Sequence, residues 1–100
     1  MNERPLPPQV ERLRERIEEL DLELVHVLSE RFQVVEELSI WKNENLMSVE
    51  DPEREAFLSE LYARVARQRG LDVSFVQRLF EMIIAQSRER QERAKKPKRA

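Results

Sequence analysis

Apolar residues recur along the first half of the chain at alternating steps of four and three residues, beginning at Leu13. The positions in this series, called the stripe below, are Leu13, Ile17, Leu20, Leu24, Val27, Arg31, Val34, Leu38 and Trp41. A repeat of this period predicts an amphipathic helix with a heptad seam. Arg31 is the one charged residue in the series, and a cation in an otherwise apolar seam requires an explanation.

The predicted helix is longer than a chain of this size can cover by itself. It starts near Pro8 or Gln9, after the breaker PLPP, and runs to about Asn43. Roughly 35 residues at a rise of 1.5 Å span about 50 Å, whereas a globule of 100 residues has a radius of gyration of about 13 Å. The stripe therefore predicts packing against the same stripe of a second copy, in a homodimer.

Two shorter helices are expected to follow. Asp51 and Pro52 are suited to the N-cap and first position of a second helix, and Gly70 to its left-handed C-terminal cap. Asp72 or Ser74 would cap a third helix that runs to about Gln91. The apolar faces expected to be buried are Phe57, Leu58, Leu61, Tyr62 and Val65 in the second helix, and Val76, Leu79, Phe80, Ile83 and Ile84 in the third. Since strand signals are absent, the pattern predicts an all-α fold of one long and two shorter helices.

Composition limits the class of protein and the kinds of site. The chain has 38% charged residues, one glycine and no cysteine, which favours long helices and excludes disulfides, thiolate catalysis and zinc–thiolate sites. An apolar run long enough for a membrane span and a signal peptide are both absent, so we expect a cytoplasmic protein. We expect a flexible N-terminus at 1–8, a helical domain at 9–92 and a basic disordered tail at 93–100.

Charge is distributed unevenly between the body and the tail. The segment 93–99 holds five cations, so the rest of the chain carries −7 against a total of −2. An acidic body disfavours a nucleic-acid-binding domain. The tail is typical of a solubilising terminus, although it could also contact an acidic protein partner.

Several polar residues fall where the helical pattern expects apolar ones or where helices begin. Arg31 and Lys42 are eleven residues apart, about three turns, so they share a face roughly 16 Å apart. Ser87 and Gln91 continue the buried series of the third helix and neighbour each other. The segment EDPERE places Asp51, Arg54 and Glu55 at the start of the second helix.

Each of these residues also has a purely structural interpretation. Arg31 could fix the register of the seam, and Lys42 could complement a helix dipole. Asp51 could be a plain N-cap, with Arg54 and Glu55 as solvated surface charges. Ser87 and Gln91 could mark a helix that emerges into water, and His26 lies off the stripe as a surface residue.

Taken together, the polar residues indicate one kind of chemistry. They supply fixed cations and amides, without a credible nucleophile, a His–carboxylate pair or a metal-binding cluster, so neither a metal nor a cofactor is expected. Such a set suits a small dianion whose reaction requires positioning and charge stabilisation.

The segments LRERIEELDLELVHVLSERFQVVEELSIWK, VEDPERE and LFEMIIAQSRERQ resemble the AroQ-type, all-helical chorismate mutases over residues 10 to 91. The resemblance implies an intertwined dimer of three-helix chains. It also implies the Claisen rearrangement of chorismate to prephenate, on the shikimate route to phenylalanine and tyrosine. Some small members of this family are activated by a partner enzyme.

The resemblance assigns roles to residues of this sequence. It implies that Arg14 and Arg31 bind the two substrate carboxylates, and that Lys42 and Gln91 donate to the ether oxygen. Lys42 would also reach a carboxylate.

At the other end of the substrate, the resemblance places Asp51 and Glu55 against the ring hydroxyl. Arg54 and Ser87 would support the polar end of the pocket. Ser39 and Trp41 stand where many members carry a glycine and a small residue, so larger side chains lie near the position of Lys42.

Helix geometry supports one implied feature independently. Arg14 and Arg31 are seventeen residues apart, which is about 25 Å along one helix, and they point in different directions. One small substrate cannot contact both from the same chain, so Arg14 would come from the partner. Arg31 then interrupts the stripe because the seam opens there into a pocket, where a guanidinium binds a carboxylate bidentately.

Three alternatives on this scaffold remain open from the sequence. The isochorismate pyruvate lyase branch lacks an acid at the position of Glu55, which disfavours it. A 4-amino-4-deoxychorismate mutase would use Asp51 and Glu55 to accept an ammonium. A non-catalytic dimerisation module would tolerate replacement of Lys42 and Gln91.

Overall fold

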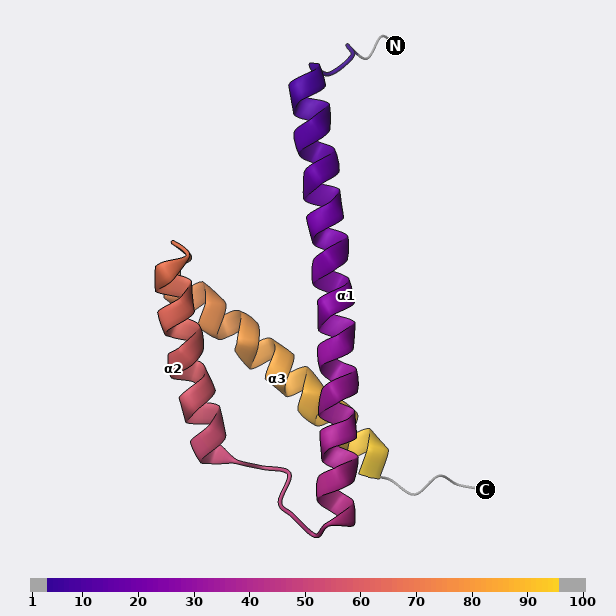
Figure 1. The fold of residues 1–100 in the computed structure, drawn as a ribbon, viewed down its shortest axis with the longest axis vertical. Coiled ribbons are helices and arrows are strands. Elements are labelled where there is room, and N and C mark those ends of the chain that lie inside the picture. The colour runs from indigo at the N-terminus through magenta and orange to yellow at the C-terminus, as the bar shows by residue number, and fades with distance from the viewer. Residues whose placement is uncertain (1–3, 96–100) are drawn as a thin grey trace, which may run out of the picture. The chain divides into compact units, whose positions relative to one another are not determined.

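Three helices make up the regular structure of residues 4–95, which are the residues that the computed structural model describes (Figure 1). The helices are α1 (Pro8–Glu44), α2 (Pro52–Gln68) and α3 (Val73–Lys95), and this described part contains no strand. The predicted all-α class is therefore confirmed. α3 extends four residues beyond the expected end at Gln91, and residues 96–100 of the predicted basic tail lie outside the described residues, as do residues 1–3.

The chain divides after Gln33 into two compact units. The described residues of the first unit are the short segment before α1 and the first part of α1 itself. The second unit holds the last turns of α1 together with α2 and α3.

Both ends of α1 have an identifiable local cause. Pro8 occupies the first helical position, and the carbonyl of Pro7 accepts from the Val10 amide at 2.9 Å. At the other end the amide of Met47 donates to the carbonyl of Lys42 at 2.7 Å, with Leu46 in the left-handed region at φ +56°. This is the Schellman arrangement, in which a leucine takes the position usually held by glycine.

The ends of α2 and the start of α3 follow the predicted capping residues. The Asp51 carboxylate caps α2, and Gly70 takes the left-handed conformation at φ +72° after its last turn. The Leu71 amide donates to the Ala66 carbonyl at 2.8 Å, so α2 also ends in a Schellman arrangement. Asp72, rather than Ser74, caps α3, because its Oδ1 accepts from the Ser74 amide at 3.1 Å.

Replacing Gly70 with alanine is expected to lower the free energy of unfolding by about 1 kcal/mol, because a Cβ disfavours the left-handed backbone. A Cβ at this position would meet no atom within 4 Å, so the cost comes from the backbone and not from a clash. Urea unfolding followed by circular dichroism measures the difference. Gly70→Asn is the matched control and should lose less, since asparagine tolerates this conformation. Equal losses in the two variants would contradict the explanation.

The contact between α2 and α3 uses smaller residues than the sequence pattern predicted. Ala63, Ala66 and Val76 are buried, and the rings of Tyr62 and Phe80 stack with centroids 3.9 Å apart. Small side chains on α2 let the two helices approach closely. The expected burial is therefore wrong for Phe57, Val65 and Leu79, which are all exposed.

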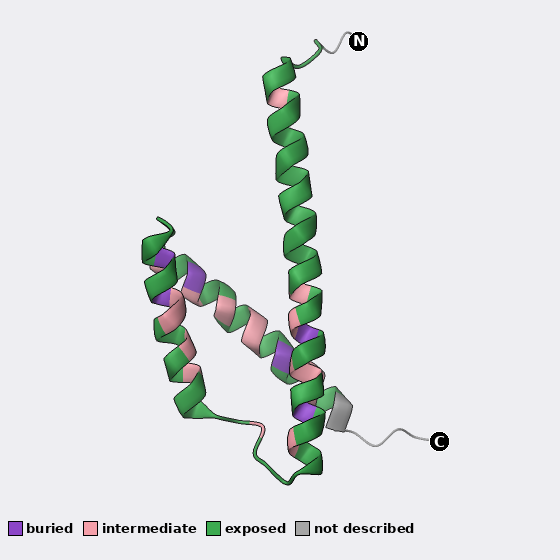
Figure 2. Cartoon of the chain, viewed as in Figure 1, coloured by how far each residue is buried: buried purple, intermediate pink, exposed green. Residues whose placement is uncertain are grey.

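The apolar residues of the stripe in the first unit are exposed, with Leu24 68% and Val27 59% accessible (Figure 2). The other exposed stripe residues of this unit are Leu13, Ile17 and Leu20. Apolar side chains in such a contiguous row are the mark of an interaction surface. Among the described residues, none of the helices is apolar over a sufficient length to span a membrane.

Candidate active site

The N-terminus of α2 holds the two predicted acids and Arg54. Oδ1 of Asp51 accepts from the Arg54 amide at 3.1 Å, which confirms the capping interpretation of Asp51. The Arg54 guanidinium lies over the ring of Phe57, 5.8 Å from its centroid. Asp51 and Arg54 are exposed, whereas Glu55, one turn into the helix, is half-buried.

Glu55 is joined to α3 by an ion pair that the sequence did not reveal. Nη2 of Arg88 donates to Oε1 of Glu55, linking the first turn of α2 to the C-terminal half of α3. Glu55 is thus more than the solvated surface charge that one interpretation of the sequence allowed. The two residues are 33 positions apart, so predicting the pair requires knowing how α2 and α3 are rotated against each other.

Ser87 and Gln91 lie one turn apart on α3. Ser87 is only 7% exposed, and its hydroxyl donates to the Ile83 carbonyl at 3.0 Å. This burial contradicts the interpretation of Ser87 as a residue where the helix emerges into water. Gln91 is half-buried.

Lys42 lies in the last turn of α1 and is half-buried. The same part of α1 is tied to α3 by Glu36, whose Oε1 accepts from Nε of Arg90 at 2.7 Å. Ser39 is buried at 3% exposure, whereas Trp41 is exposed. A small polar side chain at 39 therefore occupies a packed position on the helix that carries Lys42.

Arg14 and Arg31 both belong to the first unit. Arg14 is exposed and Arg31 is half-buried. Because α1 is continuous from Pro8 to Glu44, their Cα atoms are about 25 Å apart along the helix. Because one unbroken helix carries both arginines, they are as far apart within one chain as the sequence predicted.

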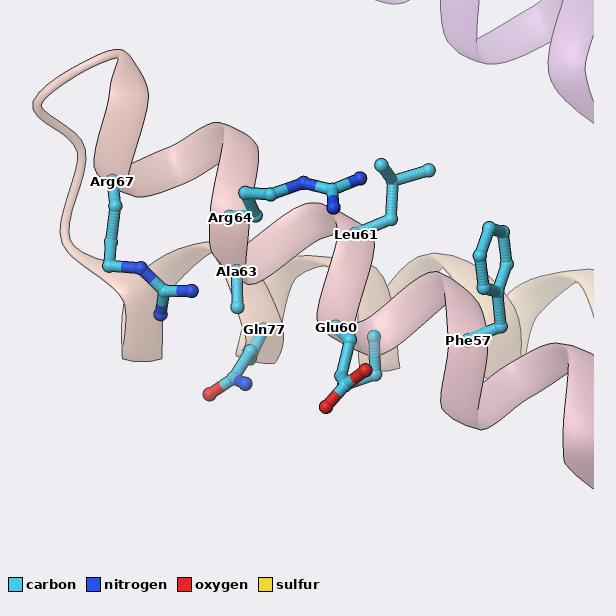
Figure 3. A pocket seen from close by; sticks show the side chains of 8 residues that line it. Phe57, Glu60, Leu61, Ala63, Arg64, Arg67 and Gln77 are labelled. Carbon is cyan, nitrogen blue, oxygen red and sulfur yellow. The ribbon is translucent and has the colours of Figure 1, made fainter.

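Two hollows lie along α2 and α3, and Glu55 alone of the predicted site residues lines either of them. The first, about 360 Å³, includes Phe57, Glu60, Arg64, Arg67 and Gln77 among its lining residues (Figure 3). The second, about 430 Å³, is lined by Glu55, Ser59, Tyr62, Gln77, Phe80, Glu81, Ile84, Ala85 and Arg88. Neither hollow includes the predicted cations Arg14, Arg31 and Lys42, so these two hollows of one chain do not gather the predicted site.

The described residues also contain no group of three or more metal-binding side chains of the His, Cys, Asp or Glu type. Fixed charges and hydrogen-bond donors are what the candidate residues supply: guanidinium groups, one ammonium, an amide and two carboxylates. Such groups can bind and polarise an anionic substrate.

The model of the chorismate mutase type II family matches residues 13–92. The chain belongs to this family. The match covers α2, most of α1 and α3 and every predicted site residue, and it confirms the resemblance seen in the sequence.

Three relatives of this family member differ in their reactions. The isochorismate pyruvate lyase of Pseudomonas aeruginosa is 38% identical over 72 residues, which cover 72% of this chain and 70% of that protein. The chorismate mutase of Methanocaldococcus jannaschii is 22% identical over 72 residues, covering 72% of this chain and 73% of the relative. The bifunctional chorismate mutase/prephenate dehydratase of Buchnera aphidicola is 30% identical over 74 residues, covering 74% of this chain but 19% of that longer protein.

Proposed function

We propose that this family member is a chorismate mutase, which converts chorismate to prephenate by an intramolecular Claisen rearrangement. A C–C bond forms while the ether C–O bond breaks, so the reaction requires neither a nucleophile nor a cofactor. The proposal includes a role in the biosynthesis of phenylalanine and tyrosine and a cytoplasmic location. Two relatives with mutase activity in their names support it.

The presence of an acid at position 55, Glu55, favours the mutase over the lyase. The lyase relative has the higher identity, so identity alone would favour pyruvate release. The resemblance described above implies that the lyase branch lacks an acid at this position. In this chain the acid is present and is held by Arg88 at the junction of α2 and α3. A carboxylate at this place suits a substrate whose ring hydroxyl must be bound.

The proposed roles divide the substrate into a dianionic end and a hydroxyl end. Arg14 and Arg31 bind the two carboxylates, since guanidinium groups match carboxylates bidentately. Lys42 and Gln91 donate to the ether oxygen, where negative charge grows as the bond to the ring breaks. Holding the substrate in its compact reactive conformation lowers the barrier further.

Asp51 and Glu55 accept from the ring hydroxyl in this proposal, while Ser87 and Arg54 support the same end. Asp51 already accepts from the Arg54 amide, which holds its carboxylate at the helix terminus. Ser87 is buried on α3, one turn before Gln91, so it fixes the helix surface that presents Gln91.

A homodimer supplies the remaining element of the proposal. The exposed stripe of α1 offers a row of apolar side chains, and its period fits the same row of a second copy. Because Arg14 and Arg31 of one chain are about 25 Å apart along α1, we assign Arg14 of each site to the partner chain. The active domain would then be residues 9–92, with the basic tail as a separate contact element.

Chorismate and isochorismate should be offered separately to the purified protein, with prephenate and pyruvate measured as products. The proposal expects prephenate from chorismate, at a rate far above that of pyruvate release from isochorismate. If pyruvate release from isochorismate is the dominant reaction, the protein is a lyase and the mutase proposal is wrong. A folded protein that converts neither substrate would leave the 4-amino-4-deoxychorismate mutase and the non-catalytic helical module as the alternatives.

A further inference from the structure

Both carboxylates proposed to face the ring substituent are already engaged by donors of this chain. Oδ1 of Asp51 accepts from the amide of Arg54 at the N-terminus of α2. Oε1 of Glu55 accepts from the guanidinium of Arg88. One acid is therefore compensated by a helix terminus and the other by a full positive charge.

The packing of α2 on α3 keeps Arg88 beside Glu55. The stack of Tyr62 on Phe80 fixes α2 against α3, and the buried Ala63 and Ala66 allow the close approach of the helices. The hollow of about 430 Å³ that Glu55 and Arg88 line includes both of these rings. Arg88 is accordingly positioned by the same contacts that position Glu55.

A hydroxyl and an ammonium make different demands on this arrangement. A carboxylate has about four acceptor sites, so Glu55 can accept from a hydroxyl while Arg88 occupies Oε1. An ammonium would place a second cation on the same carboxylate, where it meets repulsion from Arg88. Because Glu55 and Arg88 form a pair without net charge, Glu55 would also offer an ammonium less attraction than a free carboxylate does.

We propose that Arg88 is a specificity-determining residue, which makes the site select a ring hydroxyl over a ring ammonium at the position facing Glu55. The proposal rests on the proposed mutase function and deepens it, because it separates chorismate from 4-amino-4-deoxychorismate. Arg88 acts by compensating the charge of Glu55 and is not a catalytic residue.

The test compares kcat/KM for chorismate and for 4-amino-4-deoxychorismate in the wild type and in Arg88→Gln. The wild type should prefer chorismate, and Arg88→Gln should shift the ratio toward the amino substrate by about fivefold, the effect of losing one partly exposed charge. A ratio within each variant does not depend on the fraction of active protein, so partial misfolding leaves it readable. Circular dichroism checks that helicity is retained.

Two matched variants separate the charge of Arg88 from the general effect of removing an arginine from α3. Arg88→Lys keeps the cation and should stay near the wild-type ratio. Arg78→Gln removes an exposed arginine from the same helix and should leave the ratio unchanged.

The possible failures are distinguishable. If chorismate is converted to prephenate but Arg88→Gln keeps the wild-type ratio, the role of Arg88 is overturned while the mutase function stands. Wild-type preference for the amino substrate overturns both the role of Arg88 and the choice of chorismate. Conversion of neither substrate by a folded protein overturns the mutase function and, with it, this inference.

Discussion

Replacing Lys42 with alanine is expected to lower kcat for chorismate by about 10²- to 10³-fold, the loss typical of removing one donor to a developing negative charge. The ether oxygen gains charge mainly in the transition state, so kcat should fall more than KM rises. Loss of chorismate absorbance, followed over a range of substrate concentrations, gives both constants. Lys42 is half-buried in the last turn of α1, where its loss should leave helicity unchanged.

Asn43→Ala is the control for this variant, since it alters the exposed neighbouring side chain of the same turn. Its kcat should remain at the wild-type value. Gln91→Ala removes the second proposed donor to the same oxygen and should also reduce kcat. Full mutase activity in both Lys42→Ala and Gln91→Ala would refute the role of these residues as donors to the ether oxygen.

Replacing Leu24 with glutamate is expected to dissociate the proposed dimer and abolish most activity. Burial of a leucine side chain contributes about 1.5–3 kcal/mol, and a twofold dimer contains this position twice. The dimer dissociation constant should therefore rise by at least about 10²-fold. Sedimentation equilibrium and prephenate formation, measured over one concentration series, follow assembly and activity together.

Leu22→Glu provides a matched control, because Leu22 is equally an exposed leucine of α1 but lies off the stripe. It is about 200° around the helix from Leu24 at 100° per residue. This variant should keep both the dimer and the activity. Dissociation by Leu22→Glu but not by Leu24→Glu would show that another face of α1 forms the interface.

Local signals in the sequence predicted the helices well because their causes are local. Pro8 begins α1, the Asp51–Pro52 pair begins α2, Gly70 ends α2 and Asp72 caps α3, each through local preferences. The end of α1 differs in kind. Leu46 adopts φ +56° although leucine does not favour this region. The residue type at this position therefore does not indicate the left-handed backbone that follows α1.

Contacts between helices were less predictable, because they depend on how one helix is rotated against another. Apolar periodicity pointed to Phe57 and Val65, whereas Ala63 and Ala66 form the buried surface of α2. The same limit applies to the ion pair of Arg88. Arg88 follows Ser87 directly, and only the packing of α2 on α3 joins it to Glu55.

The individual polar residues were identifiable from the sequence as a set, but their assembly was not. Asp51, Glu55, Ser87 and Gln91 occupy the helix positions expected of them, and Ser87 is buried as its place in the apolar series suggested. Sequence spacing gives positions along each helix. It does not give the arrangement that brings residues of two chains around one substrate.

Mixing Arg14→Ala and Arg31→Ala chains tests most directly the central claim, a chorismate mutase site shared between two chains. Each variant alone should lose about 10²-fold or more in prephenate formation. Equal amounts, unfolded together and refolded, should recover about a quarter of wild-type activity, because half of the dimers are mixed and each mixed dimer has one intact site. A mixture no more active than its parents would contradict the claim that Arg14 is supplied by the partner.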